Sequence, residues 1–168
     1  MEQLLNATIC PPRTKDVTGL GWAVHPEGFA ASLQRLAALF PDRDLVVTES
    51  GAAYDDPMGG RSIADQDRLG YHAAYIGAVG RAIAAGVPVR GYFAWSLFDN
   101  FEWSQGYGPR FGIVGIDYAT QRRPVKASGS WYRTVIDANA LPIGDDADGR
   151  CRRNSRPTMI YRCQQSQK

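Results

Sequence analysis

One stretch in the middle of the chain constrains the fold most strongly. Residues 45–47 are a short, uninterrupted apolar run, and residues 89–95 form a second run rich in apolar and aromatic side chains. Small and apolar residues recur between them at helical spacing, at Leu69, Ala73, Ile76, Val79, Gly80 and Ile83. Apolar runs without alternation favour strands buried on both faces, and strand–helix–strand units build parallel sheets. The sequence therefore predicts an α/β fold with a βαβ unit at its centre.

Two further helices are expected beside this unit. Pro26 occupies a favoured first helical position, and the apolar stripe that follows predicts a helix of about 15 residues that ends at Pro41. A second apolar stripe, Trp131, Tyr132, Val135 and Ile136, predicts a last helix over 127–138 that ends at Asn139.

Local signals at the ends of the central helix complete the expected secondary structure. Asp65 is expected to cap its start, and Gly86 with Pro88 is expected to end it. Residues 111–118 are expected to form a further short strand, and residues 52–64 a loop.

Composition excludes several classes of protein. The chain has 168 residues, of which 44% are hydrophobic and 11% aromatic, which is a globular composition. No apolar run approaches the roughly 20 residues of a membrane helix, and the first residues do not resemble a secretory signal. The net charge of +2 does not suggest nucleic-acid binding. We therefore expect a cytoplasmic protein without a membrane or nucleic-acid partner.

The chain is predicted to have three parts: an irregular N-terminal segment 1–15, a body 16–138 and a tail 139–168. The tail holds six basic and three acidic residues and few apolar ones, so we expect it to be disordered, although a basic tail can also bind polyanions.

Metal and disulfide chemistry is not expected. The odd number of cysteines (Cys10, Cys151 and Cys163) without a CxxC pair suits a reducing compartment, with a Cys151–Cys163 bridge as the lesser alternative.

Polar and aromatic side chains follow both predicted strands. Glu49 comes directly after the first apolar run, and Trp95 ends the second. Functional groups of parallel α/β folds gather where strands end, and a glutamate there is costly to bury without a partner. From the residues alone, Glu49 is either a functional carboxylate or a strand-end residue paired with a nearby arginine.

Four segments resemble glycoside hydrolase family 1, the β-glucosidases. These are Gly21-Trp22-Ala23-Val24-His25-Pro26-Glu27-Gly28, Thr48-Glu49-Ser50-Gly51-Ala52-Ala53-Tyr54-Asp55-Asp56, Gly91-Tyr92-Phe93-Ala94-Trp95-Ser96-Leu97-Phe98-Asp99-Asn100-Phe101-Glu102-Trp103 and Arg110-Phe111-Gly112-Ile113-Val114. The resemblance covers about residues 16–138. It implies a partial (β/α)8 TIM barrel that consists of strands seven and eight with their flanking helices. The first six strands and the Asn-Glu-Pro motif with the family's acid/base glutamate have no counterpart in the sequence, so the resemblance implies a truncated barrel.

The resemblance also implies roles for individual residues and no cofactor. Glu49 matches the nucleophile of a retaining glycosidase, although the next residue is Ser50 where the family usually has Asn. Glu102 matches a carboxylate that accepts hydrogen bonds from sugar hydroxyls. Trp95 would stack on the C–H face of the sugar, the indole N–H of Trp103 would donate to a hydroxyl, and Phe111 would line the wall. Family members that take 6-phosphorylated sugars usually replace this glutamate, so Glu102 favours an unphosphorylated sugar.

The sequence leaves three functional hypotheses open. The first is a truncated retaining β-glucosidase for small, terminal, unphosphorylated β-D-glucosides, with homo-oligomers covering the open barrel edge; glucose, galactose and fucose are not distinguished. Its leaving group would be protonated by Glu102, Asp55, Asp56 or a carboxyl from another subunit, among which Glu102 is preferred. The second hypothesis is a non-catalytic sugar-binding fragment, and the third is an inactive structural remnant.

Overall fold

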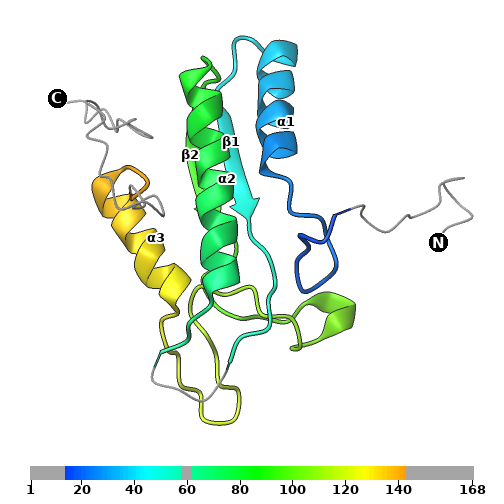
Figure 1. The fold of residues 1–168 in the computed structure, drawn as a ribbon, viewed down its shortest axis with the longest axis vertical. Coiled ribbons are helices and arrows are strands. Elements are labelled where there is room, and N and C mark those ends of the chain that lie inside the picture. The colour runs from blue at the N-terminus through cyan, green and yellow to red at the C-terminus, as the bar shows by residue number, and fades with distance from the viewer. Residues whose placement is uncertain (1–13, 58–61, 143–168) are drawn as a thin grey trace, which may run out of the picture.

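The structure is a computed structural model that describes residues 14–57 and 62–142. Its elements are α1 (Pro26–Leu39), β1 (Leu45–Ser50), α2 (Gln66–Ala84), β2 (Val89–Ala94), the 3-10 turn η2 (Trp103–Gln105) and α3 (Ala127–Ala138). Figure 1 shows α2 between α1 and α3, with the two strands behind it and their carboxyl ends turned toward the loops. Most of segment 1–15, most of tail 139–168 and all three cysteines lie outside the described residues.

The predicted βαβ unit is confirmed. β1 and β2 pair in parallel, in a register that aligns Val47 with Tyr92 and Ser50 with Ala94. Because α2 connects the two strands, their carboxyl ends lie at the same edge of the sheet. This edge is where the sequence placed its candidate site.

Only one face of the two-stranded sheet is covered within the described residues. Val47 and Val89 pack with residues of α1 and α2 in a core that also contains Leu33, Val79, Ala82 and Val87. On the opposite face, Val46 is 51% exposed and Phe93 is 59% exposed. The expectation of strands buried on both faces is therefore wrong for this part of the chain, because no described element lies over the second face.

The predicted helix ends hold at most positions. Pro26 begins α1, and α3 spans the predicted residues. Gly86 (φ +92°) follows α2 in the left-handed region, and Asn139 (φ +47°) ends α3 in the same way. Both residue types tolerate this conformation better than most others.

Two local predictions are wrong for the same physical reason, namely that aspartate side chains bind distant backbone amides. Asp65 precedes α2 but makes no capping bond to it; its carboxylate accepts the backbone N–H of Ser128, 2.9 Å away, in the first turn of α3. Residues 111–118 form no strand, because the Asp99 carboxylate takes the N–H groups of Gly112 (2.9 Å) and Ile116 (3.2 Å). Only isolated bridges remain there.

No helix in the described ranges is long and apolar enough to cross a membrane.

Candidate active site

The site is built on the shared carboxyl edge of β1 and β2. Glu49 is the penultimate residue of β1 and is exposed, and Trp95 directly follows β2 and is 38% exposed. The Trp95 N–H donates to the carbonyl oxygen of Ser50 at 2.8 Å, which extends the strand pairing by one residue. The backbone that carries Glu49 is thereby tied to the backbone that carries Trp95.

The loop after β2 brings a second carboxylate and a second tryptophan. The N–H of Glu102 donates to the carbonyl oxygen of Gly106 at 2.7 Å, and the N–H of Gln105 donates to the carbonyl oxygen of Glu102 at 2.8 Å. This tight turn leaves Glu102 half-buried and Trp103 81% exposed. An exposed indole beside a carboxylate presents both an apolar face and charged acceptors to a ligand.

Phe111 lies deeper than the other four predicted site residues. Its side chain is buried, and its ring centroid is 6.5 Å from that of Trp22 at a tilt of 50°. Its carbonyl oxygen accepts the N–H of Ser96 at 3.2 Å. Phe111 therefore supports the exposed Trp22 ring and the start of the loop that carries Glu102, and it contributes buried packing rather than an open surface.

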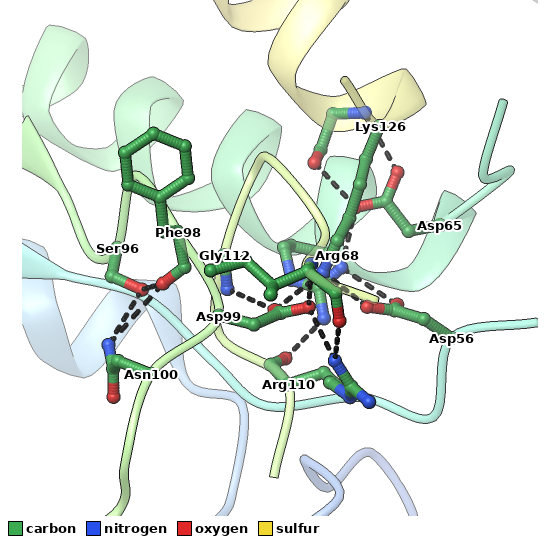
Figure 2. A network of polar contacts seen from close by, with 12 residues as sticks. Asp56, Asp65, Arg68, Ser96, Phe98, Asp99, Asn100, Arg110, Gly112 and Lys126 are labelled. Atoms are coloured by element: carbon green, nitrogen blue, oxygen red, sulfur yellow. Dashed lines mark hydrogen bonds and ion pairs between the residues drawn. The ribbon is translucent and has the colours of Figure 1, made fainter. Parts of the chain in front are cut away.

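A buried charge cluster lies behind these loops, and Figure 2 shows its side chains converging from segments that are far apart in the chain. We use this name for Asp56, Asp65, Asp99, Arg68, Arg110 and Lys126. Three negative and three positive groups balance one another. Five of the six side chains are fully buried and Arg110 is 20% exposed, so the balance is needed to offset their desolvation.

Asp99 accepts four polar contacts within this cluster. Arg110 donates to its Oδ2 atom at 3.1 Å and Lys126 donates to its Oδ1 atom at 2.8 Å, in addition to the two backbone N–H groups named above. A carboxylate can accept about four hydrogen bonds, so this one is saturated. Asp99 therefore holds residues 110–116 against the start of the loop that carries Glu102.

Asp56, one of the predicted alternative acids, is engaged in the same cluster. Its carboxylate binds Arg68 at 2.8 Å and also Lys126, and its side chain is fully buried. Because Asp56 is paired with two basic side chains and is not exposed, it has no access to a substrate. Asp55, the other alternative on this loop, is exposed.

Part of this cluster could have been predicted from helical spacing in the sequence, although it belongs to none of the recognised motifs. Arg68 and His72 precede Ile76 at successive spacings of four residues, which places them on one helix face. All three are buried in α2. Helical periodicity alone could therefore have placed a charged and a titratable side chain in the interior.

His72 is a buried titratable group beside this cluster, and its pKa is strongly lowered. Burial, assisted by the neighbouring Arg68 charge and opposed by Asp65, lowers its pKa from 6.5 to about 4. Its Nδ1 atom is 3.5 Å from the hydroxyl of Tyr92. His72 is therefore neutral at physiological pH.

Within residues 14–57 and 62–142, no group of three or more His, Cys, Asp or Glu residues could hold a metal ion.

Comparison with known proteins decides the family. The model of glycosyl hydrolase family 1 matches residues 5–141. The chain belongs to glycosyl hydrolase family 1. The resemblance of its four segments is thereby confirmed, and with it the α/β fold.

Two similar proteins are named as a glucan glucohydrolase and a beta-glucosidase. The chain is 48% identical to the 1,4-beta-D-glucan glucohydrolase of Thermotoga neapolitana over 125 residues, which are 74% of this chain and 28% of that protein. It is 48% identical to beta-glucosidase A of Thermotoga maritima over 126 residues, with the same two shares.

A solved structure agrees with these relatives. The Thermotoga maritima beta-glucosidase in complex with deoxynojirimycin superimposes with a TM-score of 0.73 and 43% identity, over 81% of this chain and 30% of that one. The chain therefore spans less than a third of the length of the relatives that it matches.

Proposed function

We propose that this chain carries the nucleophile and part of the sugar-binding surface of a retaining β-glucosidase. The observation that carries the proposal is the position of Glu49 and Trp95 at one edge of neighbouring parallel strands, followed by the loop with Glu102 and Trp103. In parallel α/β folds this edge holds the functional groups. The names of the family-1 relatives support the same reaction class.

Glu49 acts as the nucleophile. One oxygen of its ionised carboxylate attacks the anomeric carbon, the bond from that carbon to the leaving oxygen breaks, and the leaving oxygen takes a proton from an acid. A water molecule then attacks the same carbon, the bond from that carbon to the Glu49 oxygen breaks, and a proton of the water returns to the deprotonated acid. Because Glu49 is an exposed residue of a paired strand, its carboxylate has both access to substrate and a rigid base.

Trp95, Glu102 and Trp103 bind the sugar, and Phe111 supports the wall behind them. The charged oxygens of Glu102 accept hydroxyl hydrogen bonds, which are stronger than bonds to a neutral acceptor. A phosphate on the sugar would be repelled by this carboxylate, so the substrate is an unphosphorylated β-D-glucoside or a close epimer. Trp95 and Trp103 are both exposed, so that Trp95 can stack on sugar C–H groups and the indole N–H of Trp103 can donate to a sugar hydroxyl.

The described residues represent the last units of a (β/α)8 barrel, with β1 and β2 as its seventh and eighth strands. Three observations support this assignment: the bare face with Val46 and Phe93, the short sheet, and an apolar pocket of about 570 Å³ lined by residues of α2, β2 and α3. Full activity requires the remainder of the barrel, in the same polypeptide or from another chain. Homo-oligomers that cover the open edge are the alternative.

Activity of the purified 168-residue chain tests the proposal. The assay measures nitrophenolate release from p-nitrophenyl β-D-glucoside, and mass spectrometry follows labelling by an activated 2-deoxy-2-fluoro-β-glucoside, which traps a glycosyl-enzyme on a retaining nucleophile. We expect aryl glucosides to react and cellobiose to react far more slowly, because no acid/base glutamate of the family motif is present in the sequence.

Two glutamate variants sharpen this experiment. Glu49→Gln should abolish turnover and labelling, whereas Glu27→Gln, an exposed glutamate of α1, should leave both unchanged. A label on a residue other than Glu49, or an active Glu49→Gln protein, would disprove the nucleophile assignment.

A non-catalytic sugar-binding role is the second candidate, and the exposed Trp103 beside Glu102 favours it. Binding of glucose without turnover or labelling would select this role. If the chain neither binds glucose nor shows turnover or labelling, the third hypothesis, an inactive structural remnant, would be selected.

A further inference from the structure

Lys126 is an unusual side chain for its position. It directly precedes α3, and its side chain is fully buried. Its ammonium group donates to Asp99 at 2.8 Å and also binds Asp56. A lysine is rarely buried completely unless it is paired, because its charge is costly to remove from water.

The two aspartates belong to the two loops that leave the carboxyl edge of the sheet. Asp56 lies seven residues after Glu49, in the loop that follows β1. Asp99 lies three residues before Glu102, in the loop that follows β2. Lys126 therefore connects the segment of one candidate site carboxylate to the segment of the other.

The two aspartates do not share any other basic partner among the described residues. Asp56 also binds Arg68, and Asp99 also binds Arg110. Each aspartate thus has an arginine of its own, whereas Lys126 is the cation that contacts both (Figure 2). Arg68 also donates to the carbonyl oxygen of Arg110 and so reaches the backbone of the second loop. Among the described basic side chains, Lys126 is the one that contacts a carboxylate of each loop.

We propose that Lys126 is a positioning residue that sets the loop of Glu49 and the loop of Glu102 relative to each other. What the two glutamates then do rests on the function proposed above; the connection of the loops does not. Buried ion pairs contribute little net stability compared with apolar packing, and their best attested use is to specify one arrangement among several. Through this connection, the described residues by themselves hold the loop of Glu49 and the loop of Glu102 in one arrangement.

Hydrogen exchange of individual backbone amides measures this role directly. The reporting amides are those of Tyr54 in the first loop and of Asp99 and Gly112 in the second, each of which donates a hydrogen bond between segments. The reference amides are those of the β1–β2 pair. In Lys126→Met we expect the reporting amides of both loops to exchange at least about tenfold faster relative to the reference amides, through local opening.

Val79→Ala is the matched control for stability. Val79 is fully buried in the core with Val47 and Val89 and belongs to neither loop. Its truncation lowers the stability of the whole domain, so exchange in the two loops should not rise relative to the reference amides. If the ratio of loop exchange to reference exchange is the same in Lys126→Met as in Val79→Ala, Lys126 contributes stability only. Acceleration in one loop alone would show that Lys126 does not connect the two loops.

A charge-balanced variant removes the objection that an unpaired buried carboxylate causes the effect. Asp56→Asn combined with Lys126→Met leaves two aspartates and two arginines in the cluster, so it should fold even if the single variant does not. The connection is still missing, and we expect the same acceleration of both loops. Normal protection in this double variant would overturn the proposal.

Labelling by the 2-fluoroglucoside separates this proposal from the proposed function. If Glu49 of the unaltered chain is labelled, Lys126→Met should be labelled at least about tenfold more slowly at a temperature where it is fully folded, because a small displacement of reacting groups can reduce the rate this much. If the unaltered chain is not labelled, the catalytic proposal fails, and hydrogen exchange still decides the role of Lys126.

Discussion

The backbone of Gly51 passes so close to Trp95 that a Cβ atom on the glycine would lie 1.7 Å from the carbonyl oxygen of Trp95. This approach is possible only without a side chain, and it occurs directly after Glu49 and Ser50 at the edge of the candidate site. Two backbones in such contact cannot separate to admit a methyl group without breaking the strand pairing beside them. Gly51 thus couples the ends of β1 and β2.

Gly51→Ala should therefore destabilise the domain and displace the site. We expect a loss of at least about 2 kcal/mol in the free energy of unfolding, because overpacking against a backbone atom cannot be relieved by a rotamer change. Urea denaturation measures this loss. Gly70→Ala is the control: a Cβ atom there meets nothing within 4 Å, and alanine in a helix interior should stabilise slightly. Equal stability of the two variants would contradict the close contact.

The buried His72 should make stability depend on pH in a narrow window. Its pKa falls from 6.5 in the unfolded chain to about 4 in the folded one, so the unfolded chain binds more protons between these values. The free energy of unfolding should therefore decrease as the pH is lowered from 6.5 toward 4, by about 3 kcal/mol in total. Urea denaturation across this range should show a much weaker slope for His72→Gln. The exposed His25 offers the control, since His25→Gln should retain the slope; an unchanged slope in His72→Gln would refute the assignment.

Asp65 should stabilise the contact between the starts of α2 and α3 instead of acting as an ordinary cap of α2. Its carboxylate binds Ser128 through both the backbone N–H and the hydroxyl, and it also binds Arg68 at 2.6 Å. Asp65→Ala should lower the free energy of unfolding by about 3 kcal/mol, because it leaves buried donors without a partner. Asp67→Asn, an exposed change in the first turn of α2, should cost less than about 1 kcal/mol. Thermal unfolding followed by circular dichroism compares the two, and similar losses would argue against the cross-helix contact.

The charge of Glu102 should strengthen sugar binding. Glu102→Gln keeps the size of the side chain and replaces a charged acceptor by a neutral one, so affinity should fall roughly tenfold. Titration calorimetry with deoxynojirimycin, a ligand in the solved structure of the Thermotoga maritima beta-glucosidase, measures the change. The exposed Glu27→Gln controls for general effects of removing a carboxylate. Unaltered affinity in Glu102→Gln would remove this residue from the proposed site.

Much of the local structure followed from the sequence, because it depends on neighbouring residues. Pro26 restricts its own φ angle to helical values, and Gly86 and Asn139 accept the left-handed conformation that ends a helix. The βαβ unit followed from periodicity and length in the same way. The positions of Glu49 and Trp95 at one sheet edge followed in turn, because parallel strands joined by a helix share the direction of their carboxyl ends.

The tertiary structure decided which partners the charged residues have. Asp65 has the sequence position of a cap for α2, but it binds Ser128, 63 residues away, and Lys126 binds Asp56 across 70 residues. A carboxylate satisfies its hydrogen bonds with whatever donors the fold brings near it, and burial makes those bonds obligatory. The spacing of these residues in the sequence does not indicate that they lie close together in the fold. Local sequence therefore determined the elements and the edge where Glu49 lies, whereas the buried charge cluster that holds the loops of this edge together was decided by the packing of segments far apart in the chain.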